Sequence, residues 1–260
     1  MAPRKRLLDL LVLAFPEHSR DELYRLVMCG EVARLDPSGP SVQRDPRQLV
    51  PADSRFTIQR QRFVSRGGEK LSAALDAWRI DPSHRVWLDA GASTGGFTDC
   101  LLKYGAAAVH AVDVGYNQLD YRLRRNTRVI VRERTNVRDL SALEPPAQAC
   151  VCDLSFRSLQ GVLRHLLMLT TEGWGIALLK PQFEAASEVR WGEHDHVGAP
   201  ESAGILSGQY RIDVVDRAIT RIQESEGVTV LRRMECPLPG RRGNREELLL
   251  VGLAEGLTPG

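Results

Sequence analysis

Four side chains that can exchange a proton or hold a ligand stand at the ends of apolar, strand-like runs. Asp89 and Asp113 each close such a run, Asp153 ends a third, and Lys180 directly follows a fourth. In an open α/β sheet, ligands bind beyond the carboxyl ends of the strands, so these side chains are expected to line one crevice. A lysine there, close to apolar walls and to a second cation such as Lys70, can give up its proton and act as a base. The arrangement predicts acid–base chemistry on a bound ligand.

A glycine-rich loop follows the first of these runs, between Asp89 and Phe97. Gly91, Gly95 and Gly96 allow the backbone to turn sharply and to approach a ligand, and the helix expected beyond them offers free N–H groups. The spacing is neither the G-x-G-x-x-G of dinucleotide-binding proteins nor a P-loop, because no Gly-Lys-Ser/Thr follows. The residues of this loop predicted to contact a cofactor are Asp89, Gly91, Ser93, Gly95, Gly96 and Phe97.

Residues further along the chain narrow the identity of the cofactor. Asp113 lies about 20 residues beyond Gly91, where an acid reaches the ribose hydroxyls of a nucleotide. Asn136, just past the next apolar run, is placed to meet the adenine edge or, alternatively, to act as a structural cap. An adenosine compound without a pyrophosphate satisfies these features, and S-adenosylmethionine fits best. Asp153 is included among the predicted cofactor-binding residues because it belongs to the same sheet edge.

Length and composition bound the class of protein. The chain has 260 residues, enough for one large domain and a small one, and a net charge of +2. Arginines cluster between residues 122 and 138 and between residues 241 and 245; such patches suit phosphates, although ordinary solvated surface is the alternative. The five cysteines lack framework spacing, which favours a reducing compartment. Cys150 and Cys152 are predicted to lie in the core, and no metal site is expected.

The N-terminus superficially resembles a signal peptide, because Arg4–Arg6 precede the apolar run Leu7–Phe15. Asp9 interrupts that run, and the same residues fit an amphipathic helix over Lys5–Ala14. No other stretch approaches the ~20 apolar residues of a membrane span. The protein is therefore expected to be soluble and cytoplasmic, with no membrane partner.

Residues 1–60 are expected to form a small α+β domain. Ser19 can cap a second helix that ends at Gly30, and strand-like pieces follow at Glu31–Leu35 and Arg55–Ile58, separated by a Pro/Gly-rich loop. Two helices followed by a small β part resemble the S4 RNA-binding module. Residues 61–64 are interpreted as a linker to a second domain, 65–260.

Strand and helix patterns alternate through this second domain. Expected strands are Val86–Asp89, Val109–Asp113, Val129–Arg132, Ala149–Leu154, Gly175–Leu179, Val228–Arg232 and Glu247–Leu253; expected helices are Gly96–Tyr104, Asn117–Arg124, Leu159–Leu169 and Ile212–Glu224. The order predicts an α/β domain around a mostly parallel seven-stranded sheet. Because a loop joins the last two strands, they should pair antiparallel, as in class I (Rossmann-like) methyltransferases. The polar segment Ala185–Gly208, with His194–His196, is expected to be a mobile loop rather than a metal site.

Seven short motifs, in order along nearly the whole chain, resemble the hemolysin A/TlyA family. They are Ser65–Lys70, Leu88–Phe97, Val112–Tyr116, Glu133–Asn136, Asp153–Phe156, Lys180–Glu184 and Pro237–Gly240 with Gly243–Asn244. That family joins an S4 domain to an FtsJ-like 2′-O-methyltransferase domain. The resemblance implies S-adenosylmethionine-dependent methylation of a ribose 2′-hydroxyl, with cytidine suggested as the nucleotide. The implied partner is ribosomal RNA or a ribosomal subunit.

The resemblance also implies a catalytic Lys-Asp-Lys-Glu tetrad, which maps onto Lys70, Asp153, Lys180 and Glu246. Glu247 is adjacent, and a shift of one residue would exchange the two glutamates. Since side chains alternate along a strand, only one of them can face the crevice.

Four other functions compete with ribose methylation. Methylation of an exocyclic amino group is disfavoured because Asp153–Phe156 lacks the Pro-Pro run of those enzymes, and cytosine C5 methylation because neither Cys150 nor Cys152 follows a proline. A membrane-active hemolysin, as the family name suggests, and a non-catalytic RNA-binding protein that keeps the fold both stay open.

Overall fold

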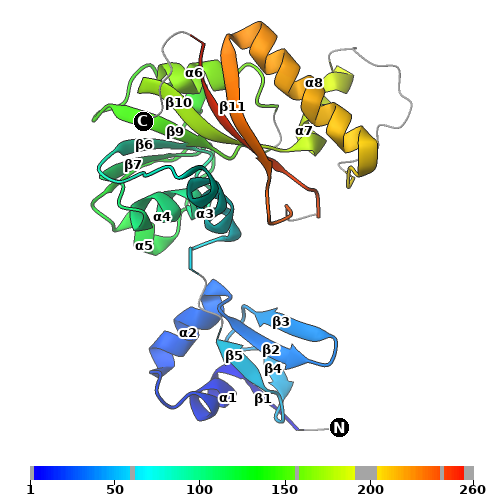
Figure 1. Ribbon diagram of the computed structural model, residues 1–260. Helices are drawn as coiled ribbons and strands as arrows, with labels where there is room; N and C mark the ends of the chain where they lie inside the picture. Colours follow the sequence, from blue (N-terminus) through cyan, green and yellow to red (C-terminus); the bar gives the residue numbers. More distant parts are fainter. Residues whose placement is uncertain (1–2, 59–61, 156–157, 191–203, 241–242, 255–260) are drawn as a thin grey trace. The chain divides into compact units, whose positions relative to one another are not determined.

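The structure, a computed structural model, describes residues 3–58, 62–155, 158–190, 204–240 and 243–254. The chain divides into an N-terminal unit, Met1–Arg62, and a C-terminal unit, Phe63–Gly260 (Figure 1). The boundary between Arg62 and Phe63 falls among the residues predicted to form a linker. Phe63 itself is only 2% exposed and lies in the core of the C-terminal unit. The backbone N–H of Val64 donates to Asp99 Oδ2 at 2.8 Å.

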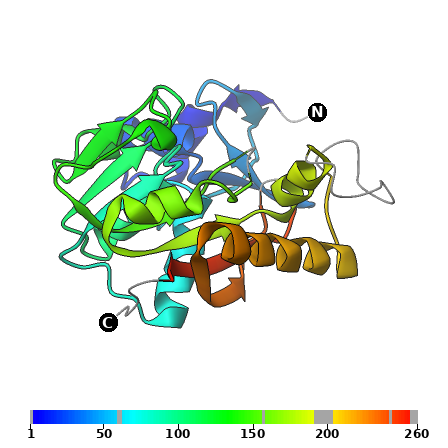
Figure 2. The same cartoon turned by 90° about the horizontal axis from the view of Figure 1, so that it is seen from above.

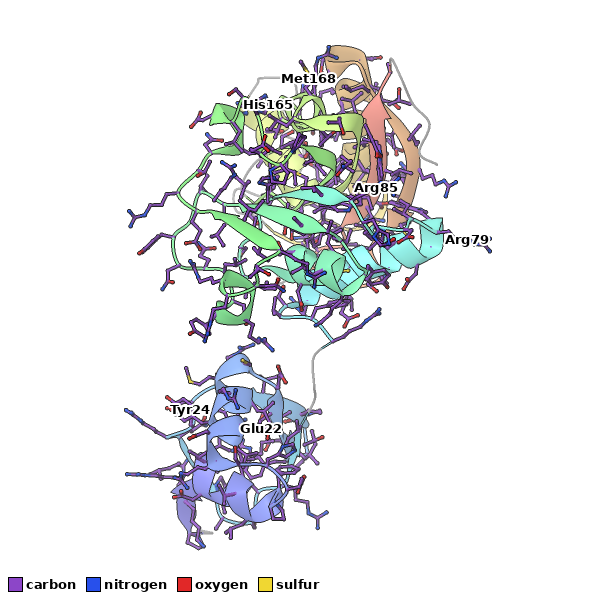
Figure 3. The ribbon with its side chains drawn as sticks, turned by 90° about the vertical axis from the view of Figure 1, so that its left-hand side faces the viewer. Glu22, Tyr24, Arg79, Arg85, His165 and Met168 are labelled. Atoms are coloured by element: carbon purple, nitrogen blue, oxygen red, sulfur yellow. The ribbon has the colours of Figure 1, made fainter. Side chains whose placement is uncertain are left out.

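The N-terminal unit packs two helices against small antiparallel sheets. Its elements are β1 (Arg4–Arg6), α1 (Leu7–Ala14), α2 (Arg20–Cys29), β2 (Val32–Asp36), β3 (Gly39–Gln43), β4 (Leu49–Pro51) and β5 (Phe56–Ile58). Strand β1 pairs with β4, and β2 lies between β3 and β5. Helix α2 buries Leu23 and Val27 in the core with Leu7 and Leu11 of α1, and it leaves Tyr24 exposed (Figure 3).

The helix boundaries in this unit follow its capping residues. Ser19 Oγ accepts the N–H of Glu22 at 3.2 Å, and Gly30 ends α2 in the left-handed conformation at φ +72°. Two expectations were wrong. Lys5 belongs to β1, because its backbone pairs with Val50 rather than starting the helix. The expected loop contains β3, which tolerates Pro40 because β3 pairs on one side only.

The C-terminal unit is built on a seven-stranded sheet in the order β11-β12-β10-β9-β6-β7-β8. The strands are β6 (Val86–Ala90), β7 (Ala108–Val112), β8 (Val129–Arg132), β9 (Ala147–Cys152), β10 (Thr170–Leu179), β11 (Val228–Glu235) and β12 (Glu247–Leu253). Strands β6 to β10 pair in parallel, whereas β12 pairs antiparallel with both β10 and β11. The predicted mostly parallel sheet with an antiparallel last pair is confirmed.

Helices cover both faces of this sheet (Figure 1). On one face lie α3 (Arg66–Trp78), α4 (Gly96–Lys103) and α5 (Tyr121–Arg124), and on the other lie α6 (Leu163–Met168) and α8 (Gly208–Glu226), with α7 (Pro181–Arg190) beside α8. Because side chains alternate along β6, Trp87 packs into the hydrophobic core on one face of the sheet and Leu88 into the core on the other face. Helix α6 buries Leu166 and leaves Met168 exposed (Figure 3). Among the described residues, no helix has both the length and the apolar character to cross a bilayer.

Three helix predictions for this unit need correction. Helix α5 starts at Tyr121 and not at Asn117, which takes the left-handed conformation at φ +56°. Helix α6 starts after Gly161, whose φ of +74° interrupts the expected helix. The predicted mobile loop begins too early, because α7 extends to Arg190; His194–His196 lie outside the described residues.

Two glycines in the N-terminal turns of α3 and α4 predict opposite effects on stability. A methyl group on Gly96 would lie 2.9 Å from the backbone N of Gly68 and against Ser65 Oγ, so Gly96→Ala must separate the two helices. A methyl group on Gly67 would meet nothing closer than 3.4 Å. We expect Gly96→Ala to lower the free energy of unfolding by about 1–3 kcal/mol. The control, Gly67→Ala, should be neutral or stabilising by up to about 1 kcal/mol in urea unfolding; equal effects would contradict this packing argument.

Candidate active site

The four side chains predicted at strand ends lie on four adjacent strands. Lys180 follows β10, Asp153 follows β9, Asp89 is near the end of β6, and Asp113 follows β7, and these strands are neighbours in that order. Because the four strands are parallel, their carboxyl ends form one edge of the sheet. The edge has a basic end at β10 and an acidic side at β6 and β7.

Lys180 and Asp153 form the first ion pair at this edge. Lys180 Nζ lies 2.5 Å from Asp153 Oδ1 and donates to Ser155 Oγ at 3.0 Å. The Lys180 side chain is 10% exposed and that of Asp153 is 26% exposed, so the pair opens to solvent on the carboxylate side. Ser155 was not predicted as a site residue, although it lies inside the Asp153–Phe156 motif; Phe156 is outside the described residues.

Lys70 and Glu246 form a second ion pair, in which Lys70 Nζ donates to Glu246 Oε2. Both side chains are buried, Lys70 at 9% and Glu246 at 4% exposure, so each charge depends on the other. Glu247, the first residue of β12, points elsewhere and accepts from Arg211 of α8 at 2.9 Å. Of the two adjacent glutamates, the structure therefore brings Glu246 to Lys70.

This difference predicts unequal effects of two neighbouring substitutions. Glu246→Gln removes the charge that balances buried Lys70, and we expect the methyl transfer implied by the motif resemblance to fall by about tenfold or more. Glu247→Gln, the matched control, alters a buried contact with Arg211 on the α8 side; it should lower stability but leave the rate within about twofold, because Glu247 does not pair with Lys70. Initial rates with radiolabelled methyl donor check both, and a larger loss with Glu247→Gln would reverse the assignment.

A buried thiol, Cys236, lies beside the second ion pair. Cys236 is 4% exposed, and its backbone N–H donates to the carbonyl oxygen of Glu246 at 2.8 Å. Burial raises the pKa of this thiol, which also senses the charges of Lys70, Glu246 and Asp153. Cys150 and Cys152, by contrast, are buried in the sheet as predicted.

Asp89 is fully buried and only half satisfied. Thr98 Oγ1 donates to Asp89 Oδ2 at 2.6 Å, whereas Oδ1 has no hydrogen-bond partner among the described residues. Burial raises the pKa of Asp89 to about 7; the hydrogen bond from Thr98 opposes the shift, and the charges of Asp153 and Asp113 add to it. Such a carboxylate attracts a cationic ligand group, because a positive charge would relieve both the desolvation and the repulsion.

The glycines after Asp89 are needed by the protein itself. Gly91 has φ +85°, and a methyl group there would lie 2.5 Å from the carbonyl oxygen of Asp153. Gly95 has φ +97° and packs on Leu119 and Leu123. The side chain of Phe97 is 3% exposed and lies in the core, where it supports the loop. Only the backbone of Phe97, in the first turn of α4, is therefore available for the predicted cofactor contact.

Asp113 joins two loops, because its Oδ2 accepts the N–H of Ser93 at 2.8 Å and its Oδ1 accepts the N–H of Gly115 at 2.6 Å. Asn136 caps the short 3₁₀ helix Val137–Asp139, accepting the N–H of Arg138 at 3.2 Å. The capping alternative for Asn136 is therefore what the structure shows.

Glu133, which the sequence motifs include without a role, holds the segment after Asp113. Its carboxylate accepts the N–H groups of Asn117 at 2.8 Å and Gln118 at 3.0 Å, and it pairs with Arg124. The hydrogen bond from Arg124 is the main cause that lowers the pKa of Glu133 to about 2. Glu133 thus stays ionised and explains why α5 starts late.

Within the described part of the chain, no cluster of three His, Cys, Asp or Glu side chains could hold a metal ion.

Comparison with known proteins gives this geometry a family. Residues 63–252 match the model of the FtsJ-like methyltransferases. The 16S/23S rRNA (cytidine-2'-O)-methyltransferase TlyA of Mycobacterium tuberculosis is 39% identical, covering 96% of this chain and 90% of its own length. Hemolysin A of Brachyspira hyodysenteriae is 34% identical, over 88% and 92%. The solved structure of a Streptococcus thermophilus protein named as a hemolysin is 29% identical and superposes with a TM-score of 0.68, over 98% and 90%. The chain belongs to the FtsJ-like methyltransferase family and, as its motifs indicated, to the hemolysin A/TlyA group within it.

Proposed function

We propose that this protein transfers a methyl group from S-adenosylmethionine to a ribose 2′-hydroxyl of ribosomal RNA, with cytidine as the nucleotide. The observation that carries the proposal is the buried lysine Lys180, paired with Asp153 at the sheet edge that also holds the glycine-rich loop. The relative from Mycobacterium tuberculosis is named for this reaction. A cytoplasmic location agrees with a ribosomal substrate.

The residues at the acidic side of the edge fit S-adenosylmethionine, which, when bound, supplies an activated methyl group on a cationic sulfur. Asp89 Oδ1, which has no hydrogen-bond partner in the part of the chain that the structure describes, is suited to a cationic group of that cofactor. Asp113 is suited to the ribose hydroxyls, and the backbone of Gly91, Gly95 and Gly96 to a closely bound ligand. Ser93, Phe97 and Asn136 would contribute through the loops that they shape.

Lys180 would act on the acceptor. A ribose hydroxyl is a weak acid and must lose its proton as its oxygen attacks the methyl group. Lys180 Nζ, if neutral, accepts that proton, or, if charged, stabilises the developing alkoxide. Asp153 holds Lys180 in place, while Lys70 and Glu246 keep the surrounding charges balanced. The remaining acceleration comes from holding the two reactants in line.

The N-terminal unit is proposed to be an S4-like RNA-binding domain, within residues 1–60, joined by residues 61–64 to the methyltransferase domain, 65–260. Its two helices and small sheets support this, as does β1, whose Arg4, Lys5 and Arg6 are all exposed. Exposed cations of this kind suit a phosphate backbone.

The test is transfer of a radiolabelled methyl group to ribosomal subunits, followed by mapping of 2′-O-methyl sites in ribosomal RNA with and without this protein. A new 2′-O-methylcytidine supports the proposal. Methylation of a base, or binding of S-adenosylmethionine without any transfer, contradicts it. Leakage of liposomes without cofactor binding would favour a membrane-active hemolysin, and RNA binding without cofactor binding a non-catalytic protein.

A further inference from the structure

A buried glutamate, Glu184, contacts both the chain that follows Lys180 and the chain that follows Asp153. Glu184 lies in the first turn of α7, directly after Lys180, and its backbone N–H donates to the Lys180 carbonyl oxygen at 3.3 Å. Its side chain is turned to the segment that follows Asp153. There Ser158 Oγ donates to Oε2 at 2.5 Å and the N–H of Leu159 donates to Oε1 at 2.9 Å. One residue therefore holds both the chain after Lys180 and the chain after Asp153.

The burial of Glu184 makes this contact costly unless it is well formed. Glu184 is 1% exposed, and burial raises the pKa of its carboxyl, while the hydrogen bonds from Ser158 and Leu159 oppose the shift. Arg221 also lowers that pKa, and Glu188 raises it. A buried carboxylate with two well-aligned donors specifies a geometry more narrowly than an apolar contact would.

Helix α7 has further contacts one turn beyond Glu184, on the same face of the helix. Glu188, one turn beyond Glu184, accepts from Arg217 at 3.1 Å and from Arg221 at 2.9 Å, and both arginines lie on α8, next to α7 (Figure 2). Because these contacts hold α7 on α8, loss of the Glu184 side chain would release the segment after Asp153 and leave the helix in place.

We propose that Glu184 is a positioning residue that sets the geometry of the Lys180–Asp153 pair, and so the rate of methyl transfer, without contributing to cofactor affinity. The inference rests on the proposed function, since it assigns Lys180 to the acceptor hydroxyl. Asp153 and Ser155, which both contact Lys180, precede Ser158 and Leu159 by only a few residues in the chain, so we expect displacement of Ser158 and Leu159 to disturb both contacts.

Three variants of the full chain test the inference. Glu184→Gln removes the charge at nearly constant size, and Ser158→Ala removes one of its two donors. Glu188→Gln, the control, weakens the contact of α7 with Arg217 and Arg221 of α8, one turn beyond Glu184. We expect Glu184→Gln to lower kcat by about 10- to 100-fold, because an error of about 1 Å can cost that much, with a smaller loss in Ser158→Ala. The Kd for S-adenosylmethionine, by calorimetry, should change less than about twofold. Glu188→Gln should lower the melting temperature with a smaller change in kcat.

Hydrogen exchange gives a readout that does not need activity. The peptide that carries the Leu159 amide, which donates to Glu184 Oε1, should exchange faster in Glu184→Gln than in wild type, in the absence of any substrate. Unchanged kcat in an active enzyme, or an equal loss of cofactor affinity, would overturn the inference, as would unchanged exchange of this peptide. If wild type methylates no RNA, the proposed function fails by itself, and hydrogen exchange still decides whether Glu184 holds the segment.

Discussion

Replacing Lys180 with alanine is expected to reduce methyl transfer by about 10²- to 10⁴-fold, the largest loss among the variants considered. The reason is the role proposed for Nζ, which lies next to Asp153 and Ser155 and would accept the hydroxyl proton or stabilise the alkoxide. Binding of S-adenosylmethionine should persist, because the glycine-rich loop, Asp89 and Asp113 are untouched. Single-turnover rates and calorimetric titration of the cofactor separate the two effects.

Lys103→Ala is the matched control for this variant. Lys103 is a lysine of the same unit, but it is 48% exposed at the end of α4 and pairs with Asp99. Its removal should leave methyl transfer within about twofold. If Lys180→Ala retained the wild-type rate, a different group would have to act on the acceptor, and the role given to Lys180 would be withdrawn.

Replacing Asp89 with asparagine is expected to change how the stability of the protein depends on pH. Burial raises the pKa of Asp89 to about 7 in the folded protein, against an ordinary value of 3.8. An acid whose pKa is raised by folding holds its proton more tightly in the folded state than in the unfolded state. The folded state therefore loses stability as pH rises from 3.8 towards 7, and the full loss is present above about pH 7. The loss is of the order of 4 kcal/mol.

Asparagine cannot ionise, so the stability of Asp89→Asn relative to wild type should increase steadily from pH 4 to pH 8. Urea unfolding of the cofactor-free proteins at several pH values measures this difference. Parallel stability curves for the two proteins would show that Asp89 does not titrate in this range. The same variant should bind S-adenosylmethionine more weakly at pH 8, because its uncharged amide cannot balance a cationic group on the cofactor. Unaltered affinity would place that cationic group elsewhere.

The sequence by itself determined the sheet and the edge on which the site lies. Apolar runs that close on Asp89, Asp113 and Asp153, or precede Lys180, are local patterns, and parallel pairing of such runs brings their ends together whatever the details of packing. The antiparallel last pair followed likewise from the absence of a helix between the last two strands. Helix starts were less well predicted. Asn117 and Gly161 take conformations with positive φ, and in the first case Glu133, from another strand, supplies the reason.

Only the tertiary structure decided which side chains meet. Lys70 and Glu246 are 176 residues apart in the chain, and no local pattern distinguishes Glu246 from Glu247. The contacts of Thr98 with Asp89, Ser155 with Lys180, and Glu184 with Ser158 likewise depend on how loops and helices pack over the strand ends. A periodic pattern in the sequence reports which face of an element is buried, because burial is a property of each residue and its near neighbours. The pairing of buried charges depends on distances between segments far apart in the chain, and those distances exist only once the sheet and its helices have packed.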